Sequence, residues 1–184
     1  EPVPTLSFAV RHLGTSAGIV LTASHNPAKY NGYKVYNDNG GQITDEAAAE
    51  ISVNIAKVSP FDVKTMDFDE GLEQGLIEWT PEEVLDSFIQ SIKKVSVPGF
   101  KASPDYSVVY TPLNGTGMEC VTRILKEIGV ENVTVVPEQA EPDGNFPTCN
   151  YPNPEFREAL ELGLKLADEV KPNLLVATDP DADR

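Results

Sequence analysis

Three short runs of apolar, mostly β-branched residues alternate with helical patterns in the second half of the chain. The runs occupy residues 107–111, 133–136 and 174–177, whereas apolar residues recur at helical spacing around 121–128 and 153–167. Strands made of continuous apolar residues that alternate with helices predict a mostly parallel sheet covered on both faces. In such a sheet, chemistry gathers beyond the carboxyl ends of the strands.

The first half of the chain carries the same kind of signal. Residues 19–22 predict a buried strand that leads into a polar loop at 23–27, and residues 33–36 predict a second strand closed by a turn at 37–41. Thr44 is a typical N-cap for a helix over 44–58. The fold class predicted for the whole chain is α/β, with mixed, mostly parallel sheets covered by helices, in two domain pieces.

An acidic stretch separates the two pieces. Residues 60–90 hold nine Asp and Glu against one base, Lys64, which indicates a solvated connector. The sequence Thr80-Pro81-Glu82-Glu83 predicts a capping box with proline at the first helical position, so a helix opens the second piece. We therefore predict one domain piece over 1–75 and another over 76–184.

Composition excludes several classes of protein. The formal net charge of −15 and the absence of a basic patch argue against nucleic acids or anionic membrane surfaces as partners. A membrane-spanning helix needs about 18 consecutive apolar residues, and no apolar stretch of the sequence approaches that length. Two cysteines in 184 residues make no disulfide framework, so we expect a cytoplasmic protein. The chain lacks an initiator Met and stops in a polar cluster after a strand, and we expect that it was cut at both ends.

Asp179, Asp181 and Asp183 follow the last predicted strand. Alternate residues of an extended chain lie roughly 6.6 Å apart, so the segment must curl before three carboxylates can meet. Pro180 fixes one backbone angle, and Ala182 leaves space. Converging carboxylates need a hard cation, and oxygen ligands suit Mg²⁺, Mn²⁺ or Ca²⁺ rather than zinc. The alternative is a solvated acidic turn.

A second polar cluster, Thr22-Ala23-Ser24-His25-Asn26-Pro27, follows the first predicted strand. Adjacent side chains rarely face each other and no Gly-x-Ser-x-Gly elbow is present, so hydrolase chemistry is poorly supported. The serine hydroxyl could instead carry a phosphoryl group, with His25 and Lys34 as candidates for proton transfer if their surroundings bring them nearer neutrality. The alternative is an ordinary loop serine beside a turn histidine.

Two weaker signals lie in the second half. Gly115-Thr116-Gly117 stands between a strand and a helix, where it forms either a tight turn, which we favour, or an anion site at the helix N-terminus. Residues 142–147 most simply make a turn in a long loop.

Five motifs in order resemble one family. They are Thr22-Ala23-Ser24-His25-Asn26-Pro27 with Tyr30-Asn31-Gly32-Tyr33-Lys34, Tyr110-Thr111-Pro112-Leu113-Asn114-Gly115-Thr116-Gly117, Pro142-Asp143-Gly144-Asn145-Phe146-Pro147, Pro152-Asn153-Pro154-Glu155, and Asp179-Pro180-Asp181-Ala182-Asp183-Arg184. Together they resemble the α-D-phosphohexomutase family of phosphoglucomutases and phosphomannomutases, from about residue 5 to 184.

The resemblance implies a role for each matching residue. Ser24 would be the phosphoserine, and Asp179, Asp181 and Asp183 would bind Mg²⁺ together with an oxygen on Ser24. Arg184 would contact the phosphoserine, and His25 and Lys34 would serve the proton transfers. The implied reaction interconverts hexose 1-phosphate and 6-phosphate through a bound 1,6-bisphosphate, with glucose 1,6-bisphosphate as activator and a sugar phosphate as substrate.

The chain also departs from the family. Members have four domains, and the sugar-recognition loop of the third and the phosphate-binding loop of the fourth have no counterpart here. We expect an excised piece, the end of domain 1 and most of domain 2, that lacks its partner domains 3 and 4 and does not turn over substrate alone. The alternatives are a phosphomannomutase or phosphopentomutase, a non-catalytic binding module, and a metal-dependent phosphatase with Asp179 as nucleophile.

Overall fold

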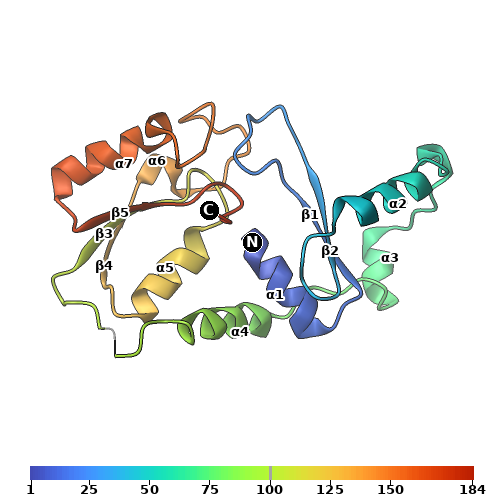
Figure 1. Cartoon of the computed structure of the whole chain (residues 1–184), viewed down its shortest axis with the longest axis horizontal. Coiled ribbons are helices and arrows are strands. Elements are labelled where there is room, and N and C mark those ends of the chain that lie inside the picture. Colours follow the sequence, from blue (N-terminus) through green and yellow to red (C-terminus); the bar gives the residue numbers. More distant parts are fainter. Residues whose placement is uncertain (100) are drawn as a thin grey trace.

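The computed structural model of the chain describes residues 1–99 and 101–184, which contain two small sheets (Figure 1). The parallel sheet has the strand order β4-β3-β5 and consists of β3 (Ser107–Thr111), β4 (Asn132–Val135) and β5 (Leu174–Ala177). The antiparallel sheet pairs β1 (Ala17–Leu21) with β2 (Tyr33–Asn37). The mixed α/β class and all five predicted strands are confirmed.

Helices cover both faces of the parallel sheet. Val108 and Tyr110 of β3 pack toward α5 (Met118–Glu127), where Val121 and Leu125 contact their cluster. On the opposite face, α7 (Arg157–Val170) places Gly163 against side chains of β3 and β5. Because neither face of the central strand meets water, its continuous apolar sequence is explained.

The antiparallel sheet is covered on one face. The helix α1 (Val3–Leu13) packs there, and a Cβ on Gly18 of β1 would lie 2.6 Å from a Val10 methyl group. Ile19 and Leu21 point to the opposite face and are 52% and 66% exposed. The prediction of a buried strand at 19–22 was therefore wrong, because a strand pattern does not say how many layers pack on it.

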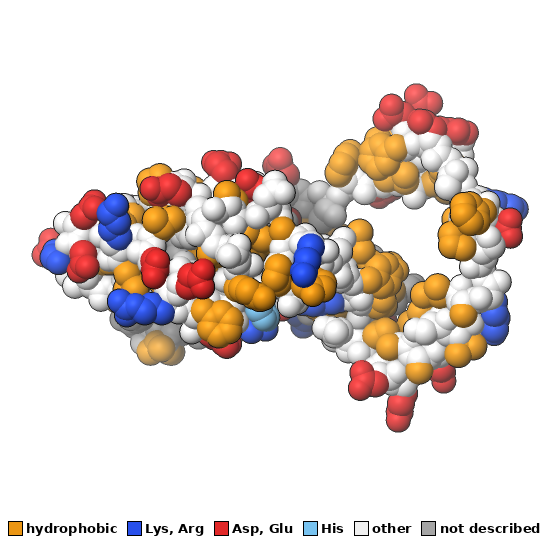
Figure 2. All heavy atoms as spheres, turned by 90° about the horizontal axis from the view of Figure 1, so that it is seen from above, with side chains coloured by type: hydrophobic (Ala, Val, Ile, Leu, Met, Phe, Trp, Pro, Cys, Tyr) orange, Lys and Arg blue, Asp and Glu red, His pale blue; other side chains and the backbone are white. Residues whose placement is uncertain are grey.

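The segment that follows β2 stays open to solvent. In α2 (Asp45–Ile55) every residue remains at least partly exposed, although Thr44 caps the helix as predicted by accepting a hydrogen bond from the Ala47 N–H at 3.4 Å. The acidic connector holds a short 3₁₀ turn (Pro60–Asp62) and α3 (Phe68–Glu73), which sequence patterns did not predict. Figure 2 shows apolar side chains around a hollow at this end of the molecule.

The helix α4 (Glu82–Lys93) bridges the two sheets. Its Phe88 ring lies 5.6 Å from Phe8 of α1, and its Ile89 is fully buried. On the other side α4 contacts α5, where Lys93 Nζ donates to Glu127 at 3.0 Å. The predicted capping box on Thr80 was wrong: Pro81 is extended and forms the N-cap without a side-chain hydrogen bond, and the helix begins one residue later than predicted.

Two further boundaries differ from prediction. The loop predicted over 137–152 contains a single helical turn, α6 (Pro137–Ala140). The next helix begins at Arg157 rather than Asn153, because residues 153–156 first form a turn in which the Phe156 N–H donates to Asn153. Among the residues described, none of the helices is both long and apolar enough to cross a membrane.

Candidate functional site

Two loops from different sheets meet at one place. The serine loop (residues 22–32) follows β1, and the carboxylate loop (residues 178–184) follows β5. The Ser24 hydroxyl donates to Asp179 Oδ2 at 2.8 Å and lies 3.3 Å from Asp181 Oδ1. The Thr22 hydroxyl donates to Asp181 Oδ2 at 3.2 Å. The two polar clusters found separately in the sequence thus form a single site.

Ser24 and Ala182 both have left-handed backbone conformations. Their φ angles are +54° and +52°, a region that costs an L-residue about 1–2 kcal/mol. The serine turn is held by the Thr22 hydroxyl, which accepts the Ser24 N–H at 2.9 Å. Such strain persists only where surrounding contacts impose it, and it concentrates at functional sites. In both loops the strained residue stands where the chain curls toward the other loop.

The carboxylate loop curls as the spacing of its aspartates required. One oxygen from each of Asp179, Asp181 and Asp183 lies within 4.8 Å of the others. Asp179 is 0% and Asp181 4% exposed. The second oxygen of Asp179 accepts the backbone N–H groups of Asp183 and Arg184 at 3.2 and 3.3 Å. The loop therefore closes around its own first carboxylate.

The two buried carboxylates are shifted in opposite directions. Burial raises the pKa of Asp179, and the charges of Asp181 and Asp183 raise it further. Burial alone would also raise the pKa of Asp181, but the hydrogen bond and charge of Lys34 outweigh it, so the pKa is lowered. The site thus holds an excess of negative charge that its own cations only partly offset.

Lys34 supplies the nearest positive charge. Its Nζ lies 3.1 Å from Asp181 Oδ2 and 3.4 Å from Asp183 Oδ2. Burial lowers the pKa of Lys34, but the hydrogen bonds and charges of these two carboxylates outweigh that effect and raise it above the ordinary value. The expectation that Lys34 titrates nearer neutrality was therefore wrong for this arrangement, because β2 places the amine against acids.

His25 reaches the serine beside it. Its Nδ1 lies 3.1 Å from Ser24 Oγ and 3.8 Å from Asp179 Oδ2. We expected adjacent side chains not to face each other, and the positive φ of Ser24 is what overturns that expectation. Arg184 contacts the serine's partner rather than the serine: its Nε lies 3.4 Å from Asp179 Oδ2, and its Nη1 lies 3.4 Å from Glu155.

Thr22 belongs to the candidate site by its contacts, although the sequence motif that contains it gave it no role. Its hydroxyl joins the serine loop to the carboxylate loop, since it accepts from the Ser24 N–H and donates to Asp181. A threonine two residues before a residue that needs a tight turn is the signal that could have identified it.

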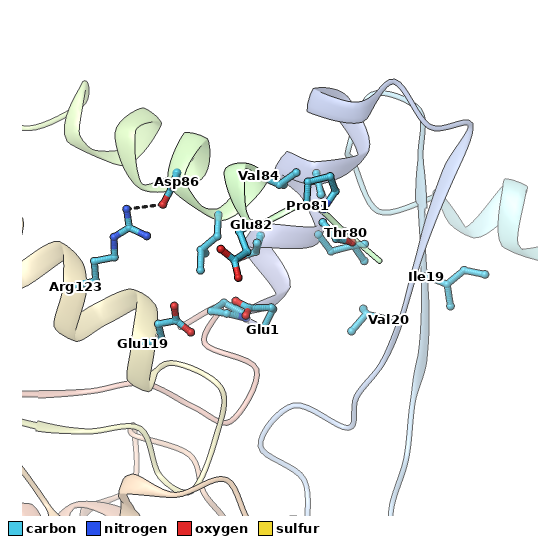
Figure 3. Close-up of a pocket in the computed structure, with 15 residues that line it drawn as sticks. Glu1, Ile19, Val20, Thr80, Pro81, Glu82, Val84, Asp86, Glu119 and Arg123 are labelled. Atoms are coloured by element: carbon cyan, nitrogen blue, oxygen red, sulfur yellow. Dashed lines mark ion pairs between the residues drawn. The ribbon is translucent and has the colours of Figure 1, made fainter. Parts of the chain in front are cut away.

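Hollows adjoin the site and also occur away from it. Ser24 lines two pockets of about 400 and 470 Å³, one shared with Lys34 and the other with Asp181. A larger hollow of about 650 Å³ lies between α1, α4 and α5, where Arg123 pairs with Asp86 at 2.7 Å (Figure 3). None of the site residues lines this larger hollow, so its volume says nothing about the chemistry at Ser24.

The donor set fits a hard divalent cation. Three carboxylates and a hydroxyl offer oxygen only, which suits Mg²⁺ and disfavours metals that prefer nitrogen or sulfur. The ammonium group of Lys34, which lies against Asp181 and Asp183, shows that positive charge is favourable at these oxygens. Asp179, Asp181 and Asp183, with Ser24, are the residues that would hold such an ion.

The chain is similar to known proteins along its whole length. Residues 1–61 match "Phosphoglucomutase/phosphomannomutase, alpha/beta/alpha domain I", and residues 86–184 match domain II of the same description. The chain is 44% identical over 185 residues to a phosphoglucomutase of Staphylococcus saprophyticus, with all of this chain and 33% of the relative covered. It is 40% identical over 196 residues to a phosphoribomutase of Saccharomyces cerevisiae, and this match covers 98% of this chain and 31% of the relative.

A solved structure extends the comparison to the fold. The phosphoglucomutase/phosphomannomutase family protein of Burkholderia thailandensis superimposes with a TM-score of 0.72 at 24% identity, covering 100% of this chain and 37% of that one. At this identity the match concerns the fold alone. The chain spans about a third of the length of the curated relatives described above.

Proposed function

Because the chain belongs to the phosphoglucomutase/phosphomannomutase family, we propose that Ser24 is its phosphoryl carrier in the interconversion of sugar 1-phosphates and sugar 6-phosphates. The observation that carries this proposal is the position of the Ser24 hydroxyl. It lies on a strained turn, 2.8 Å from Asp179 and 3.1 Å from a ring nitrogen of His25. A solvated loop serine would not be placed between two buried carboxylates and a histidine.

The chain's own residues account for the transfer from sugar to serine. The Ser24 oxygen forms a bond to phosphorus while the bond from phosphorus to the sugar oxygen breaks. The hydroxyl proton passes to a base, for which His25 is in hydrogen-bond reach, and the departing sugar oxygen takes up a proton. Lys34, whose pKa is raised by Asp181 and Asp183, keeps its proton and is suited to offer a positive charge or a hydrogen bond rather than to act as a base.

The reverse transfer completes the proposed cycle. Phosphorylated Ser24 donates its phosphoryl group to a hexose 1-phosphate and gives a bound 1,6-bisphosphate, which returns its other phosphoryl group to the serine. Mg²⁺ held by Asp179, Asp181, Asp183 and Ser24 would supply positive charge against the transferring phosphoryl group. Arg184, whose Nε lies 3.4 Å from Asp179 Oδ2, would contact a phosphorylated Ser24.

Glucose phosphate is our first choice of substrate, with glucose 1,6-bisphosphate as activator, in carbohydrate metabolism. A phosphomannomutase or a phosphopentomutase is the alternative, and the phosphoribomutase among the relatives supports the pentose. We place the activity in the cytoplasm, since both cysteines are free and buried. The 184 residues alone are not expected to sustain turnover, because they span about a third of the curated relatives.

Peptide mass spectrometry tests the proposal. The chain is incubated with Mg²⁺ and glucose 1,6-bisphosphate, digested, and searched for a phosphoryl group. We expect it on Ser24 and absent from Ser24→Ala, as a single slow transfer that does not require sustained turnover. Phosphorylation of another residue contradicts the proposal, and no phosphorylation favours a non-catalytic binding module. Phosphate release that survives Ser24→Ala but not Asp179→Asn favours a phosphatase.

A further inference from the structure

The turn between β3 and α5 is strained and rigidly held. The Gly115 N–H donates to the Pro112 carbonyl at 2.9 Å, and the two residues between them, Leu113 and Asn114, have φ angles of +49° and +57°. Two left-handed central residues characterise a type I′ turn, which a leucine adopts only under constraint. The constraint is visible, because Leu113 is buried and its N–H donates to the Thr111 hydroxyl at 3.1 Å.

Buried amides hold this turn from the other side. The Asn114 N–H donates to the Gln139 carbonyl at 2.9 Å, and the Asn114 side-chain amide donates to the carbonyls of Glu138 and Glu141. Gln139 is itself buried, and its Oε1 accepts from the Thr111 hydroxyl at 2.7 Å. The turn is therefore a fixed part of the packed sheet rather than a flexible connection.

The same turn lies directly against the carboxylate loop. Thr116 donates to the Pro180 carbonyl twice, from its backbone N–H at 2.8 Å and from its hydroxyl at 3.0 Å. A Cβ on Gly115 would collide with the Pro180 backbone, and a Cβ on Gly117 would lie 2.7 Å from the Thr178 hydroxyl. Both donors of Thr116 are thus directed to Pro180, which argues against the anion site that the Gly-Thr-Gly sequence left open.

The backbone of Pro180 connects two of the proposed metal ligands, Asp179 and Asp181. Because proline has no N–H, the Pro180 carbonyl is its one backbone hydrogen-bonding group. That carbonyl belongs to the peptide plane that leads into Asp181. The next carbonyl, of Asp181, accepts the Val3 N–H from the start of α1 at 2.8 Å. Two successive carbonyls of the loop are therefore held, one from each half of the molecule.

We propose that Thr116 is a positioning residue that fixes the carboxylate loop in its cation-binding shape. It acts through the Pro180 carbonyl and touches neither the ion nor the substrate. The proposal rests on the proposed function only in taking Asp179, Asp181 and Asp183 as the ligands. Removing a residue that orients a metal ligand without binding the metal typically weakens metal affinity by roughly 10–100-fold. We expect an effect of about that order for Thr116.

The test uses the complete 184-residue chain, labelled with ¹⁵N and titrated with Mg²⁺ by NMR. Thr116→Val removes the hydroxyl donor and keeps the branched shape, whereas Thr116→Ser keeps the hydroxyl. Thr122→Val is the matched control, since the Thr122 hydroxyl donates to Met118 within α5 at 2.7 Å. We expect Thr116→Val to weaken Mg²⁺ binding about 10-fold or more, Thr116→Ser to restore it, and Thr122→Val to leave it unchanged.

Amide hydrogen exchange in metal-free protein separates this proposal from the proposed function. We expect the N–H groups of Asp183 and Arg184, which donate to Asp179, to exchange faster in Thr116→Val than in Thr122→Val. If the parent chain does not bind Mg²⁺, the proposed cation site fails and exchange alone decides the positioning role. Should Thr116→Val not fold, the smaller Thr116→Ala replaces it. Unchanged exchange and affinity, or a Thr116→Ser variant as weak as Thr116→Val, would overturn the proposal.

Discussion

The two sheets supply the two loops of the site, yet they bury very different amounts of apolar surface. In the parallel sheet Val108, Val109 and Tyr110 are at most 1% exposed, whereas in the antiparallel sheet Ile19, Leu21 and Tyr33 are 52%, 66% and 60% exposed. The sequence of β1 is nevertheless at least as apolar as that of β3. The difference teaches that a helix on each face, rather than strand composition, makes the parallel sheet the firmer support.

The loops repeat this contrast. The carboxylate loop is held by the Gly115–Gly117 turn beneath it and by its own backbone, through Thr116 and the N–H groups that reach Asp179. The serine loop also has internal hydrogen bonds, such as that from the Ser24 N–H to the Thr22 hydroxyl, but Thr22 and Ser24 direct their side chains to the carboxylate loop. We infer that Ser24, the proposed phosphoryl carrier, takes its position from the carboxylate loop.

The largest expected effect is on α4, which packs between the two sheets, in comparison with α2, which stays open to solvent. Ile89→Ala removes a fully buried side chain from α4 and should destabilise the protein by about 2–5 kcal/mol. Ile55→Ala on α2, where the side chain is 59% exposed, should change stability by less than about 0.5 kcal/mol. Urea unfolding monitored by circular dichroism compares the two, and equal losses would contradict the contrast.

A smaller effect is expected at the contact between the loops. Asp181→Asn weakens the ion pair with Lys34 and should cost about 1–3 kcal/mol at neutral pH in metal-free protein. The pKa of Asp181 is lowered by folding, so its contribution is present above the ordinary value of 3.8 and is lost as pH falls through the folded pKa. Thermal unfolding between acid and neutral pH should show the cost of the variant shrinking toward acid.

Asp179→Asn is the opposite case. Burial raises the pKa of Asp179 above 3.8, so the folded state binds this proton more tightly and stability falls as pH rises from 3.8 through the folded pKa. The variant should therefore be more stable than the parent at neutral pH without metal, and the gain should vanish below pH 3.8. The same pH series measures it, and a loss of stability at neutral pH would refute the assignment of opposite shifts.

Backbone strain gives a still smaller effect. Ala182→Gly relieves a left-handed alanine but adds chain freedom to the unfolded state, so a net gain of about 0.5–1 kcal/mol is expected. Ala177→Gly, in strand β5, has no such strain to relieve and should be destabilising. The unfolding midpoints of both variants are compared with that of the parent chain. If Ala182→Gly lowers the midpoint as much as Ala177→Gly does, the backbone of the loop at Ala182 is not strained.

The smallest effect concerns thiol reactivity rather than stability. Burial, followed by the charge of Glu1, raises the pKa of the Cys120 thiol to about 11, and burial also raises that of Cys149. Both should react slowly with a disulfide reagent in the folded protein and quickly in urea. The Val58 side chain, which follows α2, is 56% exposed, so a cysteine introduced there should react at once. Fast labelling of Cys120 before unfolding would show that α5 readily separates from the parallel sheet.

Local patterns predicted the elements that depend on local sequence. The continuous apolar run at Val108–Tyr110 identified the central strand, and the rule on carboxyl ends of strands identified both loops. The three aspartates required a curl, which Ala182 provides. The helix α1 was not predicted because Pro4 in its first turn and Pro2 before it obscured an apolar face that ends at the left-handed Gly14.

What the sequence could not predict depends on contacts between distant residues. The exposure of Ile19 is set by which helices reach β1, and the strand's own pattern does not contain that information. The pKa of Lys34 is raised because a loop about 150 residues later brings Asp181 to it. The approach of His25 to Ser24 depends on one backbone angle, which is imposed by Thr22 and the carboxylate loop.

A Mg²⁺ titration of the ¹⁵N-labelled chain tests most directly the claim that the two loops form one site. The amides of Ser24 and Asp181, which belong to different sheets, are followed together. If Ser24 is positioned by the cation-binding carboxylates, both signals should shift with the same midpoint, and Asp179→Asn should abolish both shifts. Shifts confined to the carboxylate loop, or two different midpoints, would show that the serine and the carboxylates act as separate sites and would contradict the account.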